Sequence, residues 1–106
     1  MIKPHIFDYQ QKLADDIHKQ MEARKPFAYH IPTGSGYFFV LHALVDKHKS
    51  LVIDVLVHKP LESHWRMMLH AFPHPNLSIN EPSVASNWKV AIHKETLLFT
   101  YHAQRN

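Results

Sequence analysis

Apolar side chains first recur at a spacing of four residues, at Leu13, Ile17 and Met21. This spacing places them on one face of an amphipathic helix. Asp8 is a suitable N-cap, so we expect the helix to begin at Tyr9 and to end before Pro26. The β-branched and aromatic residues of 27–31 then predict a short strand.

Two longer apolar stretches lie in the middle of the chain. Residues 37–48 are apolar nearly all round the predicted helix, which is typical of a helix buried on several sides. Residues 51–57 give the strongest strand signal, a near-continuous aliphatic run as in a parallel strand covered on both faces. Asp54 interrupts this run and therefore needs a polar partner or a place at the end of the sheet.

The second half of the chain continues the alternation of helices and strands. Pro60 opens a helix at about its first turn, and Pro73 ends it. Its predicted buried stripe consists of Leu61, Trp65, Met68, Leu69 and Phe72. Short strands are expected at 77–79, 89–93 and 97–101. This order indicates an α/β fold, here a small, mainly parallel sheet with flanking helices.

Length and composition set bounds on this picture. A chain of 106 residues forms one domain, and 45% apolar with 20% charged residues is ordinary for a soluble globular protein. No apolar run reaches the ~20 residues of a membrane helix, and we see no secretory signal. Cysteine is absent, which excludes disulfide scaffolds and thiolate metal sites. We therefore expect a cytoplasmic protein that does not bind membranes.

The only two glycines of the chain, Gly34 and Gly36, stand in one short segment, Pro-Thr-Gly-Ser-Gly at 32–36. This segment lies between a predicted strand and a predicted helix. In that arrangement the backbone N–H groups of the loop and of the helix N-terminus point at a bound phosphate. The alternative is a tight strand-to-helix turn that merely needs glycine.

With its neighbours, this loop resembles part of a known family. The order Tyr9-Gln10, then 32–36, then Pro60, Leu61 and Trp65 is similar to the first half of the N-terminal RecA-like lobe of superfamily 2 helicases. The likeness is greatest to the branch of restriction-enzyme translocases and phage or repair helicases. It runs over roughly residues 5–98, and 90–97 is loosely similar to the family's next strand and threonine-containing motif.

The resemblance implies that residues 1–106 form a single truncated lobe with a degenerate nucleotide site. In the family, the glutamine of the Tyr-Gln pair reads adenine, and the glycine-rich loop holds the phosphates. The corresponding positions are Gln10, Thr33, Gly34, Ser35, Gly36 and Tyr37.

Two departures from the family decide the predicted chemistry. Tyr37 and Phe38 stand where the family has a lysine and then a threonine or serine. That lysine supplies positive charge to the β- and γ-phosphates, and that hydroxyl binds Mg²⁺. The chain also lacks the metal-holding Asp-Glu pair and the second lobe. We therefore expect no enzymatic activity, no catalytic residues and no ATP or Mg²⁺ cofactor. Phe38 and Phe39 are expected to pack into the core, whereas Tyr37 is open to either a surface or a core position.

Charge gives a weaker indication of nucleic-acid binding. The formal net charge is +3, and eleven histidines add positive charge as the pH falls. The candidates for contact with phosphates are His58, Lys59, His64, His93 and Lys94. Two further short basic clusters, Arg24-Lys25 and Lys47-His48-Lys49, are more typical of a solvated face. His58, His64 and His70 are spaced by six residues and do not share one helix face, so no metal site is expected.

These observations predict a non-catalytic interaction protein. It resembles a helicase lobe and binds a protein partner in a nucleic-acid-processing system. A role as a decoy or viral antagonist fits a phage- or virus-encoded chain in the host cytoplasm. A weak nucleic-acid-binding accessory protein is the second hypothesis, and a nucleotide-binding helicase fragment is the third. An unpaired edge of half a RecA-like sheet offers a further route, strand addition by a partner or a second copy.

Overall fold

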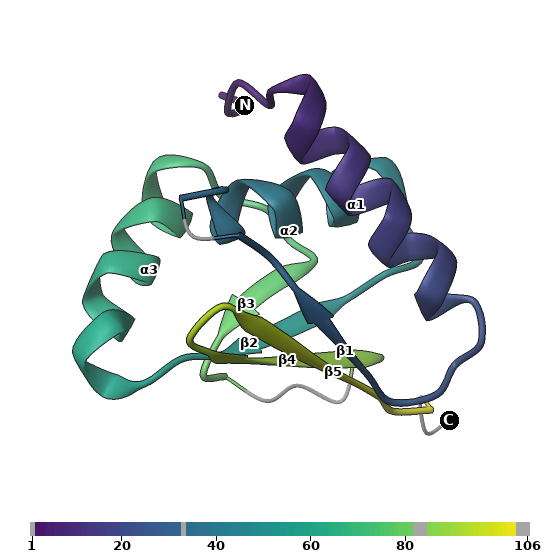
Figure 1. The fold of residues 1–106 in the computed structure, drawn as a ribbon. Coiled ribbons are helices and arrows are strands. Elements are labelled where there is room, and N and C mark those ends of the chain that lie inside the picture. The colour runs from purple at the N-terminus through teal and green to yellow at the C-terminus, as the bar shows by residue number, and fades with distance from the viewer. Residues whose placement is uncertain (1, 33, 82–84, 104–106) are drawn as a thin grey trace.

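Three helices and five strands follow one another in the computed structural model, which describes residues 2–32, 34–81 and 85–103 (Figure 1). The helices are α1 (Asp8–Met21), α2 (Tyr37–Lys47) and α3 (Lys59–Ala71). The strands are β1 (Phe27–His30), β2 (Ile53–Leu56), β3 (Leu77–Ile79), β4 (Trp88–His93) and β5 (Thr96–Tyr101). Each predicted helix and strand is present, most with shifted ends and β3 with the predicted ones, so the prediction of an α/β fold is confirmed.

The five strands form one sheet in the order β1-β5-β4-β2-β3. β2 pairs in parallel with β3 and β4, whereas β5 pairs antiparallel with β4 and β1. The sheet is therefore mixed, and the prediction of a mainly parallel sheet is wrong. The reason is local: only Lys94 and Glu95 separate β4 from β5, and so short a connection makes a hairpin. Four strands still run in one direction, because only β5 is reversed.

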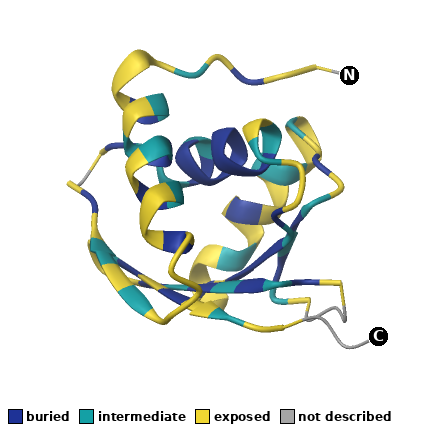
Figure 2. Cartoon of the chain, turned by 90° about the vertical axis from the view of Figure 1, so that its right-hand side faces the viewer, coloured by how far each residue is buried: buried dark blue, intermediate teal, exposed yellow. Residues whose placement is uncertain are grey.

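The three helices cover one face of this sheet (Figure 1). Alternate strand residues that face the helices are buried, among them Ile53, Val55, Val90, Leu97 and Phe99. α2 is buried over most of its circumference, as its apolar sequence predicts, and α1 packs against it. Figure 2 shows the buried residues where helices and sheet meet and exposed residues along the outer side of the sheet.

The outer face of the sheet carries an apolar row across four strands. Strand register aligns Ala28 with Leu98, Leu98 with Ala91, and Ala91 with Leu56. Leu56 and Leu98 are exposed, so the predicted covering of both faces of 51–57 is wrong at Leu56. Asp54 is fully buried, and its Oδ1 accepts hydrogen bonds from Ser78 Oγ (2.7 Å) and the Glu81 N–H (3.1 Å). Its Oδ2 has no hydrogen-bond partner among the described residues, so the polar partner that the sequence demands is found for one oxygen only.

Two local predictions are also wrong. α1 begins at Asp8 rather than Tyr9, with Phe7 as its N-cap, because Gln10 Oε1 accepts the hydrogen bond of the Phe7 N–H (3.0 Å). Leu61 is 47% exposed rather than buried. Trp65 is the buried residue of α3, so only a narrow strip of this helix packs against the rest of the domain. Leu61, one turn earlier, lies outside that strip.

Candidate functional site

The segments that follow three strands meet at one edge of the sheet. β1, β2 and β4 run in the same direction, so their carboxyl ends lie together. The loop before α2, the start of α3 and the β4–β5 turn therefore converge there. They enclose a cleft of about 560 Å³, which we call the aromatic cleft. Its lining consists of Gly34, Gly36, Tyr37, Phe38, Phe39, His64, Trp65, Met68, Lys94 and Glu95.

The glycine loop has the strand-loop-helix form that its sequence predicts. Gly34 and Gly36 both have left-handed backbone conformations, with φ of 84° and 76°. Gly36 is the N-cap of α2, and a Cβ there would lie 2.8 Å from Gln10 Nε2 and 3.2 Å from Phe39 Cδ2. Glycine is therefore required at position 36 both by conformation and by space. Ser35 is buried in this loop, and Thr33 lies outside the described residues.

Gln10 is buried and ties α1 to the glycine loop. Its Nε2 donates a hydrogen bond to the Ser35 carbonyl (2.9 Å), and its Oε1 accepts the bond from the Phe7 N–H. The amide that the resemblance would assign to adenine thus has internal partners for both its ends. In this arrangement Gln10 holds the loop against α1.

Aromatic residues occupy the two positions after Gly36, where the resemblance would require a lysine and a hydroxyl. Phe38 is only 5% exposed and packs edge-on against Trp65, with ring centroids 5.8 Å apart. Its predicted core position is confirmed, whereas Phe39 is half-buried and forms part of the cleft wall. The Tyr37 hydroxyl lies 3.2 Å from the Lys94 carbonyl oxygen, to which it donates a hydrogen bond.

Tyr37 therefore joins the start of α2 to the β4–β5 turn. Its side chain is half-buried, intermediate between the surface and core positions that the sequence left open. Burial raises the pKa of its hydroxyl, and the Glu95 carboxylate raises it further. The hydroxyl, which any tyrosine keeps protonated at neutral pH, therefore remains a donor to a higher pH than that of a free tyrosine.

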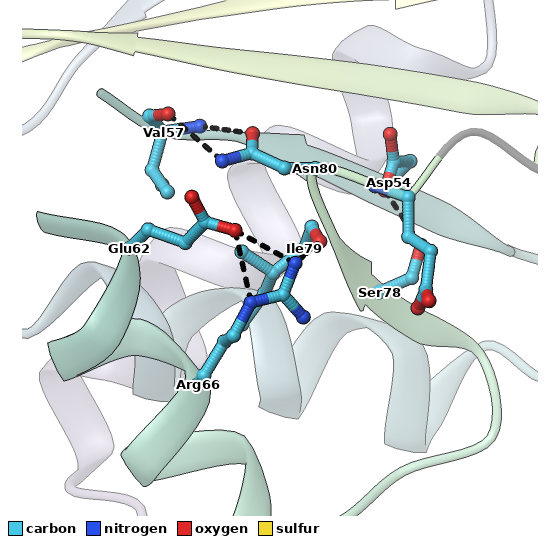
Figure 3. A network of polar contacts seen from close by, with 8 residues as sticks. Asp54, Val57, Glu62, Arg66, Ser78, Ile79 and Asn80 are labelled. Carbon is cyan, nitrogen blue, oxygen red and sulfur yellow. Dashed lines mark hydrogen bonds and ion pairs between the residues drawn. The ribbon is translucent and has the colours of Figure 1, made fainter. Parts of the chain in front are cut away.

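Polar contacts fix α3 at the other side of the aromatic cleft (Figure 3). The Asn80 side chain donates to the Val57 carbonyl (3.0 Å) and accepts from the Val57 N–H (2.9 Å), just before α3 begins. Arg66 donates to Glu62 Oε1 at 2.8 and 3.0 Å and to the Ile79 carbonyl at 3.0 Å. The Arg66 hydrogen bond lowers the pKa of Glu62. Together these contacts place α3 relative to β2 and β3.

The five basic candidates share this edge of the sheet but not one pocket. All five side chains are exposed. His64 and Lys94 line the aromatic cleft. His58 and His93 line a separate hollow of about 340 Å³ that also includes Leu56 and Leu98 of the outer sheet face. Lys59 is the first residue of α3 and lines neither pocket. The structure therefore brings two of the five to the cleft that the glycine loop lines.

Sequence reasoning missed two features. It assigned Trp65 and Met68 to a buried stripe and gave no sign that they line a cleft. It also missed the contact of His42 with His74, whose ring centroids lie 5.3 Å apart. These histidines are far apart in the sequence and follow no motif.

Among the described residues, no group of three His, Cys, Asp or Glu side chains is placed to hold a metal ion.

Comparisons with known proteins add no relative. Protein-family models, curated proteins and solved structures all give no match to this chain. The likeness to a helicase lobe therefore stays a prediction from the order of its motifs. In the part of the chain that the structure describes, no helix has the length and apolar character needed to cross a membrane.

A calorimetric titration with ATP and Mg²⁺ is expected to give no binding heat. The loop has no lysine to face the phosphates, and the Gln10 amide already has internal partners. A parallel titration with ATP and EDTA controls for the metal. Saturable heat at micromolar ATP would contradict the prediction and would show that the loop binds phosphates without its lysine.

Proposed function

We propose that this chain is a non-catalytic interaction protein that binds a protein partner through the aromatic cleft, in a nucleic-acid-processing system. The observation that carries the proposal is the apolar wall of the cleft beside the glycine loop. Phe38, Phe39, Trp65 and Met68 meet where a RecA-like lobe would hold nucleotide. A cation and a hydroxyl are the groups that phosphoryl transfer requires there, so the proposal includes no catalysis.

The size and lining of the cleft suit an anchoring side chain. Its volume of about 560 Å³ falls within the range of ligand-binding pockets, ~300–1,000 Å³. Bulky apolar side chains that enter such pockets supply most of the binding free energy at protein interfaces. Met68 and Phe39 are half-buried at the cleft, which leaves apolar surface for such a side chain to cover.

Nucleic acid is the second candidate partner, because His64 and Lys94 lie at the cleft and Lys59 starts the helix that lines it. A test follows from salt dependence. Binding of a fluorescein-labelled (dT)12 oligonucleotide, followed by anisotropy, is expected to be absent at 150 mM salt. Tight binding that weakens steeply with salt, and with Lys59→Glu or Lys94→Glu, would instead favour the nucleic-acid function.

Substituting Met68 is expected to remove binding of peptides to the aromatic cleft. Binders from a displayed library of random 12-residue peptides, selected against the full chain, are expected to lose affinity at least about tenfold with Met68→Asp, because the carboxylate places charge in an apolar pocket. Met67→Asp is the matched control, since Met67 is on the same helix, 62% exposed and outside the cleft lining. Circular dichroism checks that both variants fold.

Equal effects of the two substitutions would contradict the proposed site. The same conclusion would follow if the selection gave no peptide whose binding depends on Met68.

A further inference from the structure

The charges around the aromatic cleft are predominantly basic. His58, Lys59, His64, His93 and Lys94 are all exposed at this edge of the sheet. The carboxylates nearby have partners: Glu62 pairs with Arg66 at 2.8 Å, and Glu95 lies 3.5 Å from His30 Nε2. Among the described residues, the ammonium groups of Lys59 and Lys94 form no ion pair. Glu95 lines the cleft, and its partner His30 is charged only when it is protonated, so this carboxylate still contributes negative charge. With the histidines neutral, Lys59, Arg66 and Lys94 stand against Glu62 and Glu95, which leaves a small excess of positive charge that grows as the histidines are protonated.

The start of α2 adds to this positive potential. Gly36, which lines the cleft, is the N-cap of α2 and has no side chain with which to cap this helix end. No acidic residue stands in its first turn. The N-terminus of a helix carries a partial positive charge of about half an elementary charge. The lysines and the helix end therefore both make the electrostatic potential at the cleft more positive.

We propose that the partner segment that fills the aromatic cleft is acidic. It carries one aromatic or branched apolar side chain that enters between Phe39 and Met68, and flanking Asp or Glu residues that pair with Lys94 and Lys59. This inference rests on the proposed function and names the chemistry of its partner. Complementary charge at the rim of an interface favours encounter and excludes partners of the wrong charge.

The aromatic rings favour a peptide over single-stranded nucleic acid. Base stacking needs open ring faces and several cations along a groove. Here Phe38 and Trp65 are 5% and 7% exposed and pack against each other, so neither offers an open face. The half-buried Met68 also lines the cleft, and its thioether is a flexible group that adapts to apolar side chains.

The length of α3 sets the spacing expected in the partner. Lys59 and Met68 are nine residues apart on this helix, a rise of about 13 Å. An extended peptide covers that distance in about four residues. An acidic residue is therefore expected about four positions from the anchoring side chain.

Peptide selection with charge reversal tests this inference. Binders from the random 12-residue library, selected at 50 mM salt, are expected to be enriched in Asp and Glu around one bulky apolar residue. A synthetic copy of the strongest binder with Lys in place of each Asp and Glu is expected to bind at least about tenfold more weakly. The double variant Lys59→Glu/Lys94→Glu is expected to reverse that preference. Lys12→Glu, on exposed α1 surface, is the matched control and is expected to change neither affinity.

The outcomes separate this inference from the proposed function. Binders that depend on Met68 but carry no acidic residues would overturn the acidic partner and leave the cleft as a protein-binding site. Absence of any binder that depends on Met68 would overturn both, and tight binding of (dT)12 in that case would assign the edge to nucleic acid.

Discussion

Replacing Phe38 with alanine is expected to lower the free energy of unfolding by about 3–5 kcal/mol, the usual cost of removing a buried phenylalanine. Its ring lies between three others, with centroids 5.5 Å from Phe39, 5.8 Å from His42 and 5.8 Å from Trp65. Alanine would leave a cavity between α2 and α3. Because domains of this size are stable by only about 5–15 kcal/mol, the change is readily measured by urea denaturation.

Tyr37→Phe is the control for this substitution. It removes one hydroxyl, whose hydrogen bond to the Lys94 carbonyl has a length of 3.2 Å, and keeps the ring. The expected loss is about 0.5–1.5 kcal/mol. If Phe38→Ala costs no more than Tyr37→Phe, then Phe38 is not the core residue that the structure describes.

Acidification from pH 7.5 to pH 5 is expected to destabilise the fold through its buried histidines. His42 and His74 are 3% and 8% exposed, and burial lowers the pKa of each. His74 lowers the pKa of His42 further. Lys3 lowers the pKa of both histidines, whereas Asp46 raises the pKa of both. Lys49 also lowers the pKa of His74.

The pKa of His48 is lowered as well. Burial lowers it most, and His18 and Lys47 lower it further, whereas Asp15 and Glu22 raise it.

The direction of the effect follows from proton linkage. An unfolded histidine takes up a proton near pH ~6.5, whereas these native rings stay neutral to lower pH. The unfolded state therefore binds more protons below that pH, and stability falls as the pH decreases. Each histidine that stays neutral contributes a slope of at most about 1.4 kcal/mol per pH unit. The loss ends once the pH passes below the native pKa.

Thermal unfolding followed by circular dichroism between pH 5 and pH 8 measures this effect. The midpoint is expected to be nearly constant from pH 8 to pH 7 and to fall below pH 6.5. His42→Gln carries no titrating group at that position, so its midpoint is expected to depend less on pH. Equal midpoints at pH 5 and pH 7.5 for the unaltered chain would mean that the native histidines take up protons freely.

Local patterns in the sequence predicted the elements but not how the strands pair. Apolar spacing located each helix and strand because it reports which face of a segment is buried. The β4–β5 hairpin was missed because its two-residue turn, Lys94-Glu95, contains neither Gly nor Asn. Lys94 nevertheless adopts the left-handed conformation that this turn needs, with φ of 54°. Lysine rarely adopts this conformation, so the residue type does not indicate the turn. Two strands that read as parallel neighbours are therefore antiparallel.

The candidate site was predictable to a similar extent. The glycine loop and the segments after β2 and β4 were identified from residue type, and they converge because carboxyl ends of parallel strands share an edge. The internal partners of Gln10 were not predictable, since the Ser35 carbonyl that it contacts is set by how α1 docks. A helical stripe also does not distinguish the buried Trp65 from the exposed Leu61, because both lie on the same side of α3.

The position of β1 at the edge of the sheet has a consequence for the order of folding. β1 pairs with β5 alone, through contacts such as Phe27 with Phe99 and His30 with Thr96. The β4–β5 hairpin is local and closes within about 1–10 μs, whereas docking of β1 must close most of the chain into a loop. The glycine loop is attached to the end of β1. We therefore expect the aromatic cleft to be assembled late in folding, after the hairpin that pairs with β1 has formed.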